Sequence, residues 1–351
     1  MPSLDLNALA SALAKLPGLP TDPALTALGT DSVSHHHFDI EDTDFLLRVP
    51  KSNRWDQSTG DQLAYEAAAF KQAEPSGHTP KLAALLPKSD EAPLGGLVVQ
   101  RIAGRPADLL GKAGDLASIA DALAALHAPM PTDQALPLHV QSDPVAETLA
   151  VIRRQAAYIG AAGLGEPSRR AFGEELAWVE MFAARDREGL KNRQGPIRLV
   201  GTDTHPGNFV IDDTGRAWFV DLEKLAYGSP AIDLAHASLP TSTGWDRHSA
   251  ALLPTDAVAS FYRHYLDKVG PEQAVALASW LKPMRRLTWL RTMSWYMRWR
   301  ADWSRSPSAA VTDEGLRDHI EAYIDQCFEP DFIEATRAEW LDGPSPVPDP
   351  H

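Results

Sequence analysis

The stretch LVGTDTHPGNFVIDDTGRAWFVDLEK, residues 199–224, decides the fold of this chain. Two apolar runs, FVI (209–211) and AWFV (217–220), flank DDTG, which is typical of a hairpin turn. Asp203 and Asn208 lie in a tight loop before the first strand, and Asp221 follows the second strand. Because the strands of a hairpin run in opposite directions, we expect these three side chains to meet at one end of it.

This grouping of oxygen-bearing side chains points to metal-assisted chemistry. Carboxylate and amide oxygens suit Mg²⁺, a hard cation that usually shares its ligand shell with phosphates and water. A carboxylate beside such a centre can accept the proton of an attacking hydroxyl, and phosphoryl transfer needs little more than positioning and charge neutralisation. The alternative without a functional site is a hairpin with a solvated polar loop in the same stretch.

The residue types in these segments indicate a protein family more specifically than their spacing does. D-x-x-x-x-N followed by a hairpin and a lone Asp resembles the kinase arrangement. The segments D-x-HPGN, VDLE and GSPAIDLA resemble the aminoglycoside phosphotransferase and choline kinase family, the small-molecule branch of the protein-kinase-like fold, from about residue 27 to at least residue 300. The resemblance implies that Asp203 is the catalytic base, that Asn208 and Asp221 hold Mg²⁺, and that Asp233 braces the catalytic loop.

Two rival functions are weighed against this one. A protein kinase is disfavoured because eleven residues between Asp221 and Asp233 leave no room for a peptide-docking loop. A catalytically weak, pseudokinase-like nucleotide-binding protein is suggested by departures from the family pattern. Gly201 and Thr202 stand where the family has His-Gly, and the phosphate-covering turn DSVSHHHFDI (31–40) has no Gly.

The order of apolar patterns predicts an α+β chain with a bilobal, protein-kinase-like fold. Strands are expected within 26–50, a helix over 61–74 and two further strands up to about residue 103. These residues, 1–103, form a small nucleotide-binding lobe with a mixed β-sheet. Residues 104–351 form a larger, mainly helical catalytic and substrate-binding lobe, in which 271–281 and 284–304 are expected as two helices.

The small lobe is expected to supply the contacts to ATP, the cofactor that the resemblance implies together with Mg²⁺. Arg48 faces opposite to Phe45 and Val49 on its strand and matches the family's phosphate-binding cation, with Glu66 as its partner. The other implied contacts lie in the phosphate-covering turn and in the segment joining the lobes: Ser32, Ser34, His35, Gln100 and Ile102.

The histidines near these positions are not interpreted as metal ligands or as the catalytic base. Neighbours on a strand point to opposite faces, so only His35 and His37 of the three adjacent histidines could share a metal. Without further acids nearby, a metal site there is not expected. His205 is interpreted as a residue that braces the loop, because Asp203 already fills the role of base.

The substrate side is expected in the helical lobe, around the Trp-rich segment 285–303. Trp295, Trp299 and Trp303 repeat every four residues. They form either a buried packing stripe, as most aromatic stripes do, or a box that holds an ammonium group by cation–π attraction, as in choline kinases. The remaining substrate candidates are Glu223, Trp245 and Asp246.

Arginines interleaved in the same segment argue against a purely cationic ligand. They would meet an anionic substrate or pair with the protein's own carboxylates: Arg285, Arg286, Arg291, Arg298 and Arg300.

The composition limits the classes of molecule that this protein is expected to bind. The net charge of −14 disfavours nucleic acid and anionic membranes. One cysteine, Cys327, excludes an intrachain disulfide. The N-terminus does not resemble a secretion signal, so a cytoplasmic location is expected. The expected partner is a small molecule with a hydroxyl group; an antibiotic, a choline-like amine, a sugar and an amino alcohol remain open, and the sequence does not indicate the oligomeric state.

Overall fold

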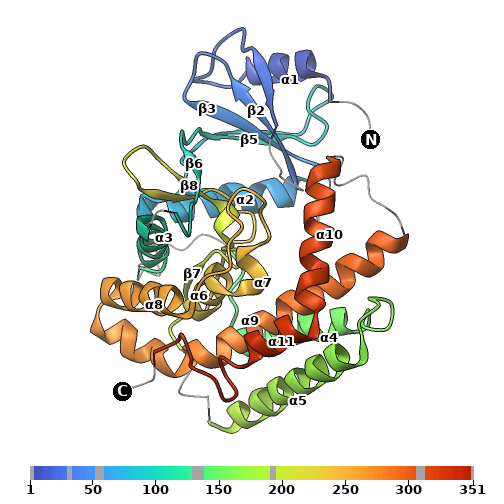
Figure 1. The fold of residues 1–351 in the computed structure, drawn as a ribbon. Coiled ribbons are helices and arrows are strands. Elements are labelled where there is room, and N and C mark those ends of the chain that lie inside the picture. The colour runs from blue at the N-terminus through green and yellow to red at the C-terminus, as the bar shows by residue number, and fades with distance from the viewer. Residues whose placement is uncertain are drawn as a thin grey trace.

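The computed structural model describes residues 4–29, 34–51, 59–111, 113–128, 138–189, 195–305 and 313–348. A small sheet stands at the top of the molecule and a larger helical part lies below it (Figure 1). The sheet has the strand order β1-β2-β3-β5-β4, with antiparallel pairs throughout rather than the mixed sheet predicted. The elements of this part are α1 (Leu6–Leu13), β1 (Leu25–Leu28), β2 (His35–Ile40), β3 (Phe45–Pro50), α2 (Thr59–Ala73), η1 (Glu74–Ser76), β4 (Leu82–Leu86) and β5 (Gly96–Gln100).

Alternation along β3 gives the sheet two different faces. Leu47 and Val49 pack with α1 in a small separate core. Arg48 points to the other face, where its guanidinium lies over the ring of Phe70 on α2. The predicted orientation of Arg48 relative to Phe45 and Val49 is therefore confirmed. Since the α2 face belongs to the main core of the molecule, the cation is held between the sheet and the helical part.

Residues 101–104 connect the sheet to the helical part. They lead into β6 (Arg105–Pro106), which pairs with β8 (Phe209–Ile211) of the hairpin that β8 forms with β9 (Ala217–Phe219). The predicted hairpin is thus confirmed, with its register fixed by Phe209 opposite Phe219. The division proposed after residue 103 falls in this connection and stays a prediction about domains.

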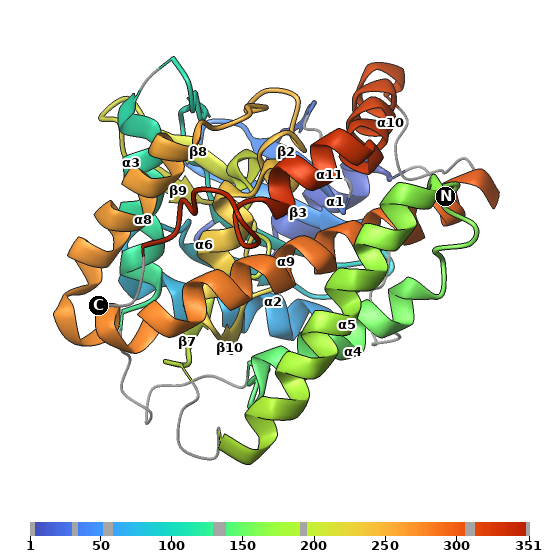
Figure 2. The same ribbon diagram turned by 60° about the horizontal axis from the view of Figure 1, so that its bottom comes forward.

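The helical part surrounds a single long helix. Helix α9 lies against α4 and α6, with α5 alongside (Figure 2). The elements are α3 (Ala113–Leu126), α4 (Pro144–Ala156), α5 (Glu166–Gly189), β7 (Arg198–Val200), η4 (Pro206–Asn208), β10 (Ala226–Gly228), α6 (Pro230–Ser238), α7 (Pro240–Thr243), α8 (Thr255–Val269), α9 (Pro271–Arg305), α10 (Glu314–Phe328) and α11 (Pro330–Arg337).

The expected break in α9 is wrong. The helix runs from Pro271 to Arg305 with Pro283 inside it. An internal proline removes one backbone hydrogen bond and costs about 3 kcal/mol. Leu277, Leu281, Met284 and Leu287 around it are all buried in the main core, and this packing outweighs the local penalty. Among the described helices, none has the length and apolar character needed to span a membrane.

Candidate active site

The loop that carries Asp203 is held in place by hydrogen bonds to Asp233 on α6. The Asp233 carboxylate accepts hydrogen bonds from the backbone N–H groups of Gly201 (2.6 Å) and Thr202 (2.8 Å), and its Oδ2 lies 3.0 Å from Nε2 of His127. Thr202 has a φ of 60°, a conformation that side chains rarely adopt. Two hydrogen bonds to a fully buried carboxylate, which His127 also contacts, hold this turn, so the loop is fixed although it lacks the family's histidine.

Asn208 and Asp221 lie beside Asp203 at one end of the hairpin, as the strand pattern predicted. The Asn208 amide donates to the backbone oxygen of Asp203 (2.7 Å) and so leaves its own oxygen, Oδ1, for another partner. The N–H of Val220 donates to the backbone oxygen of Asn208 (3.0 Å), which brings Asp221 to the same end. A carboxylate, an amide oxygen and a second carboxylate therefore gather from three points in the chain.

Two further side chains contact the Asp203 carboxylate, and the sequence analysis missed both. The ammonium of Lys224 forms an ion pair with Oδ2 of Asp203. Nδ1 of His236 on α6 is buried 3.8 Å from Oδ1 of Asp203 and has no hydrogen-bond partner among the described residues. The only signals for them were a cation three residues after Asp221 and a histidine three residues after Asp233.

Charge controls the protonation of these groups. Burial would raise the pKa of Asp203, but the positive charge of Lys224 outweighs burial and holds that pKa well below its usual range. Burial lowers the pKa of His236 well below its ordinary value, and the nearby charge of Arg291 lowers it further. The loop therefore presents an ionised carboxylate beside a neutral imidazole at neutral pH.

The predicted pair of Arg48 with Glu66 is replaced by two separate pairs. The Arg48 guanidinium donates to Oδ1 of Asp221 (2.9 Å) and to the backbone oxygen of Val220 (2.8 Å). Glu66 instead contacts His35 (3.2 Å) and Gln62 (2.9 Å). His35, reaching in from β2, comes between α2 and the residues after β9.

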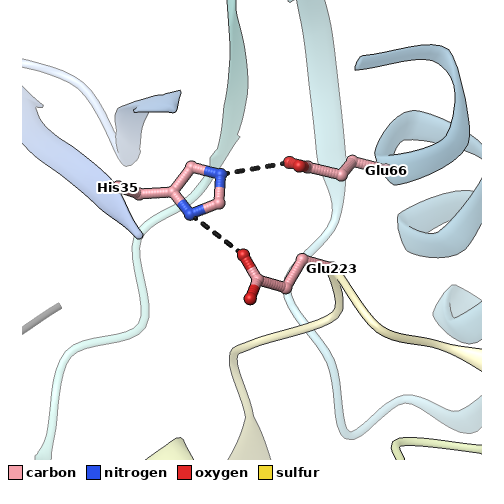
Figure 3. A group of neighbouring side chains, drawn as sticks. All are labelled: His35, Glu66 and Glu223. Atoms are coloured by element: carbon pink, nitrogen blue, oxygen red, sulfur yellow. Dashed lines mark hydrogen bonds and ion pairs between the residues drawn. The ribbon is translucent and has the colours of Figure 1, made fainter. Parts of the chain in front are cut away.

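His35 lies between two glutamates, with Glu66 on one side and Glu223 on the other (Figure 3). Nε2 is 3.2 Å from Oε2 of Glu66, and Nδ1 is 3.2 Å from Oε2 of Glu223. All three side chains are at most 3% exposed. This is the one group of three potential metal ligands found among the described residues. However, the two ring nitrogens face different carboxylates, so the imidazole itself occupies the place between them where an ion would lie.

This arrangement corrects two predicted contacts. His35 was expected to touch nucleotide phosphate and Glu223 to touch substrate, but both are buried in the triad. Burial and the charge of Arg48 would lower the pKa of His35, while hydrogen bonds to Glu223 and Glu66 outweigh them and raise it. His35 therefore links α2, which carries Glu66, to the residues that follow β9.

The triad predicts a pH-dependent contribution to stability. With a raised pKa in the folded protein, the stabilisation by charged His35 is complete below the ordinary histidine pKa of about 6.5 and is lost as pH rises through the folded value. We expect His35→Gln to lower the free energy of unfolding by about 2 kcal/mol at pH 6 and by less at pH 9, as measured by urea denaturation.

His36→Gln is the matched control. Burial lowers the pKa of His36, so its linkage has the opposite sign. The difference between wild type and this control should not shrink as pH rises. An equal loss in His35→Gln at pH 6 and pH 9 would show that His35 is not charged in the folded protein.

The remaining residues that were predicted to contact the nucleotide are Ser32, Ser34, Gln100 and Ile102. Ser32 lies outside the described residues. Ser34 contacts Nδ1 of His35 at 2.9 Å. Gln100 ends β5, where its backbone N–H donates to Lys81, and Ile102 follows in the connection between the lobes. The roles of Ser34, Gln100 and Ile102 toward a nucleotide stay predictions.

The tryptophans divide into a core group and a surface group. Trp289, which lies outside the predicted stripe, is fully buried in the main core. Trp295 and Trp299 are only partly buried and meet Trp245 at ring distances of 5.2 and 6.0 Å. Asp246, next in the chain after Trp245, packs so closely on Gly207 in the loop that carries Asp203 that no side chain would fit at position 207. A partly buried aromatic cluster therefore adjoins the loop that carries Asp203.

The arginines of α9 pair with the protein's own groups, the second of the two predicted alternatives. Arg291 donates to the backbone oxygen of Thr202 (2.8 Å). The other four contact carboxylates: Arg285 with Glu339, Arg286 with Glu175, Arg298 with Asp302 and Arg300 with Asp325. Because these arginines already have partners within the protein, they argue less strongly against a cationic ligand.

Comparisons with known proteins agree with this geometry. The model of the phosphotransferase enzyme family matches residues 26–276. No curated protein matches the sequence. Similar solved structures include a macrolide 2'-phosphotransferase from Brachybacterium faecium (15% identity, TM-score 0.55, covering 91% of this chain and 98% of that one) and an ethanolamine kinase from Plasmodium vivax (12%, 0.56, 89% and 83%). A spectinomycin phosphotransferase solved with ADP and spectinomycin is also similar (11%, 0.54, 94% and 99%).

At these identities the structural matches establish the fold, which is the predicted kinase-like one. The family match spans well over half of the chain and includes Asp203, Asn208, Asp221 and Asp233. This protein belongs to the phosphotransferase enzyme family.

Proposed function

We propose that this protein is an ATP-dependent kinase that transfers the γ-phosphate to a hydroxyl group of a small molecule. The observation that carries the proposal is the meeting of Asp203, Asn208 and Asp221 at one end of the β8–β9 hairpin. The hydrogen bonds of Asp233 to the catalytic loop support it, because they hold the loop that carries the base.

The residues present fit a magnesium ion. Asn208 has its amide nitrogen engaged and its oxygen available, and Asp221 has one oxygen engaged by Arg48 and the other available. These are hard oxygen donors of the kind that Mg²⁺ prefers. Bound there, the ion would neutralise phosphate charge.

The chain's own groups account for the remaining steps. Asp203 is ionised and can accept the proton of the acceptor hydroxyl while orienting its oxygen. The bond between the γ-phosphorus and the ADP oxygen breaks, the bond to the acceptor oxygen forms, and the proton passes by way of Asp203 to solvent, because the low pKa of this carboxyl group favours its ionised form. Arg48 on β3, fixed between α2 and Asp221, places a permanent positive charge beside the proposed metal ligand Asp221.

We propose an alcohol that also carries an amine or alkylammonium group as the acceptor. Trp245, Trp295 and Trp299 offer ring faces near the catalytic loop, and aromatic faces attract such cations. Asp246 adds a carboxylate: its Oδ1 accepts hydrogen bonds from residues 248 and 249, which leaves Oδ2 for a ligand. Similar proteins named for ethanolamine and spectinomycin are consistent with this class.

The pseudokinase-like alternative rested on the missing histidine and the turn without glycine. The bracing of the loop by Asp233 removes the first reason, since the loop is held without that histidine. Nothing observed favours the alternative further.

The test is a screen of hydroxyl compounds by ADP release, with ATP and Mg²⁺. Amino alcohols, choline-like compounds and amine-bearing antibiotics should raise ADP release well above the rate without acceptor, whereas neutral sugars should not. Omission of Mg²⁺ should abolish the increase. ATP binding without turnover on any acceptor would favour the nucleotide-binding alternative instead.

A further inference from the structure

We propose that Lys224 is a catalytic residue whose ammonium binds the terminal phosphate of the nucleotide while remaining in contact with Asp203. The inference rests on the proposed function and adds to it a residue that the family motifs do not mark. It concerns a cation that forms an ion pair with the carboxylate of the proposed base, Asp203.

The first support is the way the ammonium is bonded. An ammonium carries three N–H donors. Among the described residues, the hydrogen-bond partner of Lys224 Nζ is Oδ2 of Asp203. The side chain is 37% exposed, and the described residues offer no second hydrogen-bond partner to Nζ. A ligand can therefore bind to this ammonium without breaking its contact with the base.

The second support is the charge around it. Burial would lower the pKa of Lys224, but the carboxylates of Asp203, Glu223 and Asp221 outweigh burial and raise it. A lysine so placed stays fully charged, next to the two carboxylates that flank the proposed metal position. A nucleotide phosphate bound through a magnesium ion held by Asn208 and Asp221 would bring its charged oxygens into the same space.

The third support is that the main chain at Lys224 is fixed to the catalytic loop. The Thr202 hydroxyl donates to the backbone oxygen of Lys224 at 3.0 Å. The lysine therefore moves with the loop that carries Asp203. A partly exposed ion pair adds only about 0–1 kcal/mol to stability, so stabilisation alone gives little reason for this bracing.

During transfer, Lys224 would donate hydrogen bonds to the oxygens of the migrating phosphoryl group. It would neither gain nor lose a proton, because the acceptor's proton goes to Asp203. Preorganised donors of this kind act where charge develops in the transition state. The ammonium would also align the base with the phosphate, since it contacts both.

The terminal phosphate distinguishes this role from a general effect of charge. ATP and its non-hydrolysable imido analogue carry that phosphate, and ADP lacks it. We expect Lys224→Met to weaken binding of the imido analogue at least tenfold in the presence of Mg²⁺, while ADP binding changes less than twofold, both by calorimetry on the full chain. Lys224→Arg, which keeps the charge, should lie between Lys224→Met and wild type.

Lys268→Met is the matched control. Lys268 also pairs with an aspartate, Asp121 (3.0 Å), but on α8, and it should leave both affinities unchanged. Equal weakening of the analogue and of ADP in Lys224→Met, or no weakening of either, would overturn the role of Lys224. If wild type bound neither nucleotide, the proposed function itself would fall, a result that the wild-type titration identifies before any variant is compared.

Discussion

Asp203→Asn should reduce turnover by a factor of about 10³ or more while nucleotide binding survives. The amide keeps the shape of the side chain but cannot accept the proton of the acceptor hydroxyl, and general-base catalysis is worth roughly 10²–10⁴ in rate. It also removes the negative charge that faces Lys224. The measurement is ADP release with an acceptor from the screen, together with calorimetric binding of ADP.

Asp212→Asn is the control for this variant. Asp212 lies in the turn at the other end of the same hairpin, where hydrogen bonds from Thr214 and Trp218 lower its pKa to about 2. Its replacement should leave turnover within about twofold of wild type, because it is far along the hairpin from the loop. Turnover retained in Asp203→Asn would exclude Asp203 as the base and, with it, the proposed mechanism.

The catalytic loop could be predicted because its geometry is local. Two short strands with a DDTG turn bring 203, 208 and 221 to one end whatever surrounds them. The alternation along β3 likewise settled which face Arg48 occupies. In each case the pattern extends over a few residues, and the structure follows it.

The errors arose where contacts depend on residues distant in the chain. Arg48 was assigned to Glu66, but His35, from a strand 31 residues before Glu66, takes that glutamate and leaves Arg48 to Asp221. Nothing in the spacing of the three histidines indicates that two glutamates converge on one of them. The helix break expected near Pro283 was wrong for a related reason. Local propensity does not include the packing of α9 against α4 and α6.

Lys224 and His236 show a different limit. Both were visible in the sequence, one in VDLEK and one in AIDLAH, but single residues beside a motif carry no periodicity. Only the side-chain positions reveal that both point toward Asp203. Polar residues that follow a motif by three or four positions therefore merit inspection once a structure is available.

The second large effect is expected at Asp233. In Asp233→Ala the backbone N–H groups of Gly201 and Thr202 and the ring of His127 lose their shared acceptor. Unsatisfied buried groups of this kind cost about 1–3 kcal/mol each, and removing one partner of a buried charged network costs roughly 3–5 kcal/mol. We expect the free energy of unfolding to fall by about 4 kcal/mol in urea denaturation, with turnover lost because the N–H of Thr202 loses the acceptor that helps to hold its unusual backbone conformation.

Asp121→Ala separates this effect from the loss of any paired aspartate. Asp121 contacts His264 (2.9 Å) and Lys268 (3.0 Å), a histidine and a cation, but its side chain is 34% exposed and the pairs lie at the surface. Its loss should cost about 1 kcal/mol or less. Hydrogen exchange gives the decisive local measurement: in Asp233→Ala the amides of Gly201 and Thr202 should lose protection far more than the strands around them. If those two amides stayed protected, the loop would be held by other contacts, and the tolerance of this chain for Gly-Thr in place of His-Gly would need a different cause.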